Sequence, residues 1–216
     1  MSKDMKKLFV IILLLSTATF GQKIGKLAPE AEPEVFPPNT WGVDIMFGDG
    51  GFGLGTFYRK TLSENITGFI DFSVSESKDE KEMEYVDYFG NSFTVGKENR
   101  VFIFPLSFGA QYRLFNGTIT DNLRPYISAG VGPSLIITTP YNQEFFKAFS
   151  YAETKVALGG YIGFGANFGL SKNNLVGINF RYYLIHMFDD GVENLKNRFR
   201  NDLQHIYISL NIGLMY

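Results

Sequence analysis

The sequence predicts an all-β fold, an eight-stranded antiparallel up-and-down transmembrane β-barrel, in a chain of 216 residues. Three observations lead to this prediction. From residue 41 onward, apolar residues recur at every second position in eight segments, which is the period of a strand with two different faces. The alternate apolar positions carry no charge. Short and long connections between the segments alternate along the chain with one exception, as in membrane barrels.

The composition excludes several other classes of protein. Because the chain contains no cysteine, it is neither a disulfide scaffold, nor a thiolate metal site, nor a cysteine enzyme. Aromatic residues at 16% and apolar residues at 45% exclude a disordered chain. A net charge of -2 lacks the basic character of a nucleic-acid binder. The mean hydropathy of -0.02 resembles that of a soluble domain, so only the arrangement of the apolar residues indicates a membrane.

Residues 1–21 have the composition of a secretory signal peptide. Lys3, Lys6 and Lys7 precede an unbroken apolar run over residues 8–15, and small residues follow. A run of this length is too short for a membrane-spanning helix, which needs about 20 apolar residues. We expect cleavage after Gly21, and no cysteine at the junction offers a lipoprotein anchor.

Residues 22–39 form a proline-rich segment that we expect to lie in the periplasm as an extended tether. Pro29, Pro33, Pro37 and Pro38 lie among alanine and glutamate residues, a composition that favours a linker. No later linker divides the chain, so residues 40–216 are predicted to form one barrel domain.

The eight predicted strands each place apolar residues on one face. In the first of them these residues are Trp41, Val43, Ile45 and Phe47. The predicted strands cover residues 41–48, 52–60, 66–75, 101–114, 124–138, 154–170, 175–186 and 204–216.

The opposite face of the same strands holds small residues, tyrosines and a few charges. Glycine is frequent there, as at Gly109, Gly130 and Gly163. The charged residues of this face are Asp44, Arg59, Asp71, Arg113, Arg124, Lys155 and Arg181.

The polar face is predicted to line the lumen and the apolar face to contact lipid. A soluble lipocalin-like barrel, which is the alternative fold, has the opposite arrangement and needs a charged exterior. Glycine, tyrosine and seven charges make a poor surface for water. An eight-stranded barrel also has an interior just wide enough for side chains to fill, and the apolar set is too large to fit there.

The connections indicate which end of the barrel faces outward. The second, fourth and sixth are short, and the third, fifth and seventh are long. The first, Asp49-Gly50-Gly51, is a tight hairpin turn that departs from this alternation. Since membrane barrels have short periplasmic turns and longer outer loops, both chain ends are expected on the periplasmic side. The short connections span residues 61–65, 115–123 and 171–174, and the long ones residues 76–100, 139–153 and 187–203.

Aromatic residues of the lipid-facing set occur near the periplasmic ends of the strands, where a membrane barrel carries an interfacial girdle. The alternative is that aromatic residues simply favour strands. The expected interface residues are Trp41, Tyr58, Tyr112, Phe168 and Tyr216.

The chain ends in Ile206-Tyr-Ile208-Ser-Leu210-Asn-Ile212-Gly-Leu214-Met-Tyr216, a terminal aromatic residue preceded by alternating apolar residues. With the signal peptide and the eight strands, this ending resembles the small outer-membrane β-barrel proteins of Gram-negative bacteria, the OmpA/OmpX-like group. The resemblance covers about residues 40–216. It implies residence in the outer membrane, and insertion by the barrel-assembly machinery through the C-terminal strand.

The resemblance also implies contact with outer-membrane lipids and lipopolysaccharide, and a monomer. It does not imply one activity, because members of the group include anchors, adhesins, small pores and a few enzymes. Nucleic acid is not an expected partner.

Enzymatic and metal sites are not expected. His186 is followed by Asp189 and Asp190, and an acid and a histidine can form a hydrolytic dyad. No serine lies beside His186 or His205, so we expect both to be ordinary rim residues.

The acidic residues near His186 lack the order of a calcium loop. We expect a solvated acidic loop and no cofactor, although weak divalent bridging to surface lipids stays open. The acidic residues are Asp189, Asp190, Glu193 and Asp202.

The inward charges are the most informative chemical feature of the sequence. Isolated charges in a protected lumen are costly, so we expect them to pair, with tyrosine hydroxyls completing the hydrogen bonds. We therefore predict a non-enzymatic structural or surface-interaction protein with a mostly plugged lumen. The alternatives are a narrow OmpW-like pore or transporter for small or apolar solutes and, third, an outer-membrane lipid hydrolase around His186. The residues expected to pair are Asp44, Arg59, Asp71, Arg113, Arg124 and Arg181.

Overall fold

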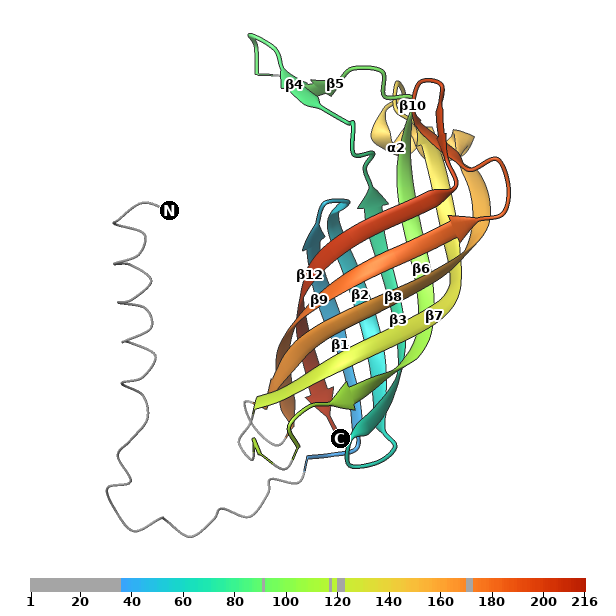
Figure 1. Cartoon of the computed structure of the whole chain (residues 1–216). Helices are drawn as coiled ribbons and strands as arrows, with labels where there is room; N and C mark the ends of the chain where they lie inside the picture. The colour runs from blue at the N-terminus through green and yellow to red at the C-terminus, as the bar shows by residue number, and fades with distance from the viewer. Residues whose placement is uncertain (1–35, 91, 117, 120–122, 170–172) are drawn as a thin grey trace, which may run out of the picture. The chain divides into compact units, whose positions relative to one another are not determined.

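Eight long antiparallel strands close into a barrel in the computed structural model (Figure 1). The structure describes residues 36–216 except residues 91, 117, 120–122 and 170–172. The predicted signal peptide and residues 22–35 of the predicted periplasmic segment lie outside the described residues. The barrel strands are β1 (Asn39–Gly48), β2 (Gly51–Thr61), β3 (Ile66–Ser77), β6 (Asn99–Arg113), β7 (Leu123–Pro140), β8 (Glu153–Gly169), β9 (Asn174–Met187) and β12 (Asp202–Met215).

The strand order confirms the predicted up-and-down barrel. Each barrel strand pairs with the next barrel strand in the sequence, and β1 pairs with β12 to close the sheet. The closing register runs from Thr40 opposite Met215 to Gly48 opposite Tyr207. Asn39 and Tyr216 then exchange backbone hydrogen bonds of 3.1 and 2.9 Å. Closure leaves no free strand edge in the barrel. A sheet that spans lipid must have no free edge, because lipid cannot hydrogen-bond unpaired backbone groups.

The alternation along each strand matches the predicted orientation. Phe47 and Ile162, of the apolar set, are 57% and 65% exposed on the outside of the wall. Asp44 and Asn211, of the polar set, lie across from each other and are buried inside. Since successive side chains of a strand point to opposite faces, one apolar exterior and one polar interior result.

The long connections contain short elements that were predicted only as loops. The third holds the hairpin of β4 (Glu84–Val86) and β5 (Ser92–Thr94), and the fifth holds α2 (Phe145–Ala148) and η1 (Phe149–Tyr151). The seventh holds the hairpin of β10 (Val192–Leu195) and β11 (Arg198–Arg200). We call the end of the barrel with these loops the outer end, and the end with Asn39 and Tyr216 the inner end (Figure 1). Across the described residues, no helix combines the length and apolarity needed to cross a bilayer.

Glycines on the inner face of the wall make room for aromatic rings in the narrow lumen. The rings of Phe57 and Phe69 are buried inside the barrel. A Cβ atom at Gly42 would overlap the ring of Phe57, and one at Gly109 would overlap the ring of Phe69 and the backbone of Ala129. The glycines are therefore needed for close packing inside the wall.

Gly109→Ala tests this packing. We expect the free energy of unfolding to fall by about 1–3 kcal/mol, because backbone and a buried ring border the added methyl group. Gly68→Ala is the control, because the nearest atom to its Cβ, at 3.1 Å, is the terminal Cδ1 of Leu62. It should change stability by less than about 0.5 kcal/mol. Urea unfolding in lipid vesicles measures both, and equal losses would contradict the packing argument.

Candidate functional site

A buried arginine between two aspartates occupies the middle of the lumen. The Arg181 guanidinium, from β9, lies 2.8 Å from an Asp44 carboxylate oxygen on β1. It also lies 3.4 Å from an Asp71 carboxylate oxygen on β3. The three side chains are at most 5% exposed. We call these residues the central charge cluster.

Polar neighbours satisfy much of the remaining hydrogen-bonding capacity of the cluster. Tyr161 donates its hydroxyl hydrogen to Asp71 over 2.7 Å, and Arg181 donates to the Tyr183 hydroxyl over 3.3 Å. Asn211 donates to Asp44, and Asn179 donates to Asn211 over 2.7 Å. A buried ion pair is tolerated when such hydrogen bonds accompany it.

Aromatic rings in contact with one another lie in the lumen around the cluster. The ring centroids of Phe69 and Tyr161 are 5.7 Å apart, those of Tyr161 and Tyr183 are 4.9 Å apart, and those of Tyr183 and Tyr207 are 5.8 Å apart. Met46 packs in the same buried cluster. These distances fall in the range of favourable aromatic pairs.

The outer end of the lumen contains an apolar cluster that was not predicted from the sequence, beside the buried polar side chains of Ser75, Ser77 and His205. Inward side chains near the outer ends of five barrel strands form a buried cluster with Val192 of β10. The signal was present in the sequence, because at the outer ends of the strands both parities become apolar. The members of this outer apolar cluster are Val101, Ile103, Ile136, Ala157, Ile185, Met187, Val192 and Leu203.

The β10–β11 hairpin covers this cluster and is held by ion pairs. Arg198 lies 2.7 Å and Arg200 lies 3.4 Å from oxygens of Asp79, a side chain with no exposed surface. Asn194, also buried, donates to the Ser77 carbonyl oxygen over 3.0 Å. Burial lowers the pKa of the Arg200 guanidinium below its ordinary value. The hairpin is thus a lid fixed to the base of the third connection.

Among the described residues, no direct ion pair joins the other predicted lumen charges to the central charge cluster. Arg59, Arg113 and Arg124 line a pocket that also includes Phe36 and Pro37, at the inner end. Lys155 lies near the outer end, 3.3 Å from Asp189 of the seventh connection. The structure therefore joins Asp44, Asp71 and Arg181 in ion pairs, and it places Arg59, Arg113, Arg124 and Lys155, which were predicted to share one network with them, toward the two ends of the lumen.

The predicted interface aromatics all lie on the outside of the barrel toward its inner end. Trp41 and Tyr58 are cross-strand neighbours, and Tyr112 faces Ile66 on the adjoining strand. All five are at least 37% exposed. The full set is Trp41, Tyr58, Tyr112, Phe168 and Tyr216.

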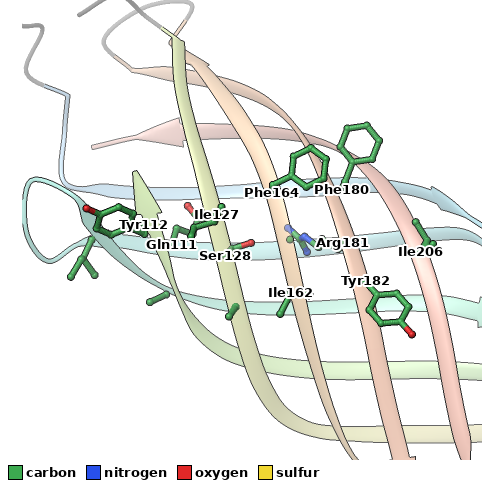
Figure 2. Close-up of a pocket in the computed structure, with 14 residues that line it drawn as sticks. Gln111, Tyr112, Ile127, Ser128, Ile162, Phe164, Phe180, Arg181, Tyr182 and Ile206 are labelled. Carbon is green, nitrogen blue, oxygen red and sulfur yellow. The ribbon is translucent and has the colours of Figure 1, made fainter. Parts of the chain in front are cut away.

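A hollow of about 860 Å³ lies in the wall at β6 to β9 (Figure 2). Most of its lining side chains belong to the outward parity. Figure 2 shows Phe164 and Phe180 side by side at its border, with centroids 5.0 Å apart. The paired alanines Ala110 and Ala129 leave room in its floor. The hollow therefore belongs to the lipid-facing surface.

The two histidines lie at the outer rim. His186 and Asp202 are 2.7 Å apart and both side chains are more than half exposed. His205 is buried and lies 2.7 Å from the Ser77 hydroxyl. His186 and Asp202 thus form an exposed acid–histidine pair on the exterior. The expectation that no serine lies beside a histidine is wrong for His205, which is buried between the Ser77 hydroxyl and an Asp49 carboxylate oxygen 3.3 Å away, because the fold brings β3, the first turn and β12 together.

The acidic residues of the seventh connection contact neighbouring groups. The Gly191 backbone N–H and then Lys155 hold the pKa of the Asp189 carboxyl below its ordinary value. Glu193 accepts a hydrogen bond from the Asn197 backbone. No group of three or more acidic or histidine side chains within the described ranges is placed to hold a metal ion.

Arg181→Met tests the central charge cluster. It should lower the free energy of unfolding by about 3–5 kcal/mol, because two carboxylates are left buried without their cation. Lys155→Met is the control, since its partly exposed pair contributes about 0–1 kcal/mol. The triple variant Arg181→Met, Asp44→Asn, Asp71→Asn should recover much of the loss. If Arg181→Met costs no more than Lys155→Met in urea unfolding, the cluster is not the main polar contact of the lumen.

Comparisons with known proteins are consistent with this geometry. No family model and no curated protein matches the chain. Among solved structures, Neisserial surface protein A matches with a TM-score of 0.50 at 10% identity, over 82% of this chain and 94% of that one. The N-terminal β-barrel domain of Pseudomonas aeruginosa OprF matches with a TM-score of 0.47 at 14% identity, over 84% and 98%. Ail, the attachment invasion locus protein of Yersinia pestis, matches with a TM-score of 0.43 at 12% identity, over 83% and 99%.

At 10% identity the first match supports the fold alone. The evidence that the barrel lies in a membrane is its apolar exterior. A closed sheet with an apolar outside and a polar inside is the arrangement that lipid requires of a spanning β-structure. The chain therefore has the fold of the small eight-stranded outer-membrane β-barrels and is an integral β-barrel protein of the bacterial outer membrane.

Proposed function

We propose that this protein is a non-enzymatic outer-membrane barrel with a sealed lumen, whose outer loops form a surface for interaction with other molecules. The observation that carries the proposal is the filling of the lumen. An ion entering from the outer end would meet the lid, the outer apolar cluster, the aromatic rings and the central charge cluster.

Permeation would require breaking strong contacts in the narrow interior. The Arg181 ion pairs close the middle of the lumen from strands on different sides of the barrel. An eight-stranded barrel is just wide enough for its own side chains. These features favour an anchor over the rival function, a narrow pore or transporter.

The hairpin of β4 and β5 supports the interaction role. It projects beyond the outer end of the barrel (Figure 1). Tyr88 and Phe89 near its tip are 98% and 86% exposed, and Tyr85 and Phe93 stack across the strands at 5.9 Å. Exposed apolar groups gathered on one loop mark sites of contact with other molecules. The aromatic hairpin is therefore the leading candidate for partner binding.

The outer surface of the barrel wall is the basis for proposing lipid partners. We propose that acyl chains of outer-membrane lipids fill the hollow bordered by Phe164 and Phe180, and that the outer rim contacts lipopolysaccharide. The C-terminal strand would be read by the barrel-assembly machinery. A monomer fits these roles, because the barrel closes within one chain.

Planar-bilayer recording tests the sealed lumen. The purified protein should give no steady conductance, because an ion would have to displace the central charge cluster and the outer apolar cluster. Steady ion-selective channels that change in the Arg181→Ala variant would establish a pore and contradict the proposal.

Single-cysteine labelling tests which loops face the exterior. Because the chain has no native cysteine, only the introduced thiol can react with the label. Tyr88→Cys should react with a membrane-impermeant maleimide on intact cells. Glu64→Cys, in a short turn at the inner end, should react only after the outer membrane is permeabilised. The reverse pattern would overturn the assignment of the aromatic hairpin to the cell surface.

A further inference from the structure

The inner end of the lumen contains a pocket of about 170 Å³ whose lining is rich in arginine. Arg59, Arg113 and Arg124 contribute to it from β2, β6 and β7, and Glu64 is the acidic residue among the lining residues that the structure describes. The described lining residues of this inner pocket are thus mainly cationic where they are charged. Its volume far exceeds the roughly 10–15 Å³ that one water needs. The pocket is large enough for a small polyatomic anion.

Arg59 carries the strongest evidence for a missing anion. Its side chain is buried, with only 2% of the residue exposed. One guanidinium nitrogen donates to Asn167 over 3.4 Å, and the guanidinium lies over the Phe57 ring at 3.9 Å. The Nε and Nη2 atoms have no hydrogen-bond partner among the described residues. A buried cation with unmet donors is costly until a counter-ion meets them.

The described carboxylates do not supply this counter-ion by direct contact. Asp44 and Asp71 are both within ion-pair distance of Arg181, and no ion pair joins a described acid to Arg59 or Arg113. Arg113 donates one long hydrogen bond, 3.5 Å, to the Ile119 carbonyl oxygen. Two arginines from neighbouring parts of the wall thus retain donors for a ligand.

We propose that the inner pocket is a binding site for a small oxyanion of the phosphate class, with Arg59 and Arg113 as direct ligands and Arg124 on its border. Guanidinium groups bind phosphate oxygens through paired, charge-assisted hydrogen bonds. The occupant is a free anion that enters from the periplasmic side. A lipid phosphate is disfavoured, because its acyl chains would have to enter the polar lumen.

Titration calorimetry with inorganic phosphate tests the site in the full-length protein, purified in octyl glucoside, a detergent without phosphate or carboxylate. The wild type should bind one phosphate per chain. Arg59→Met should weaken binding by roughly tenfold or more, the loss expected for a charged hydrogen bond. Lys60→Met is the matched control, since the adjacent residue is exposed on the other side of the wall, and it should bind as the wild type does.

A thermal-unfolding series at constant ionic strength gives a second readout. Phosphate in place of chloride should raise the unfolding midpoint of the wild type and of Lys60→Met, and should not raise that of Arg59→Met. Because Arg59→Met removes an unsatisfied buried cation, we expect it to fold. A midpoint that responds to phosphate and chloride equally in the wild type would overturn the proposal.

Three further results separate the anion from other counter-charges. If Arg59 serves the unpartnered Asp71 carboxylate oxygen through water, the wild type will bind no phosphate and the proposal fails. If only the variant Glu30→Gln, Glu32→Gln, Glu34→Gln binds phosphate, the acidic residues of the same chain are the occupants and the free anion is wrong. Binding of short-chain phosphatidylglycerol in place of free phosphate would likewise overturn the choice of a free anion.

Discussion

The ion pairs of Arg181 with Asp44 and Asp71 are the contact on which the interior of the barrel depends. Closing eight strands leaves a space that side chains must fill, and every polar group placed there needs a partner. Arg181 joins β9 to β1 and β3, so one guanidinium links strands that are not neighbours in the sheet. The tyrosines and asparagines around it complete the hydrogen bonds. This contact joins opposite sides of the barrel wall across the lumen.

The chemistry of the lumen changes along its length. Cationic residues line the inner end, the middle holds charges that are paired, and the outer end holds the outer apolar cluster beneath the lid. This order separates the roles of the two ends. The outer end packs apolar side chains beneath the loops, whereas the inner end carries cationic side chains.

Period-2 alternation was sufficient to predict the strands, their orientation and the barrel, because lipid outside and a narrow lumen inside impose opposite demands on successive residues. It also indicated that Arg181 and the two aspartates point inward. It could not say which charges meet, since pairing depends on the shear that brings Asp71 and Arg181 to one level. The lid was missed for a similar reason, because Asp79 and Arg198 are held together by tertiary contacts between two loops.

The hydrogen exchange of the arginine side chains reports whether water reaches the ion pairs in the middle of the lumen. In nuclear magnetic resonance spectra of the protein in micelles, the guanidinium hydrogens of Arg181 should be resolved and should exchange with water far more slowly than those of Arg198 in the lid. Exchange of the Arg181 hydrogens as fast as that of Arg198 would show water at the central charge cluster and would contradict a sealed barrel.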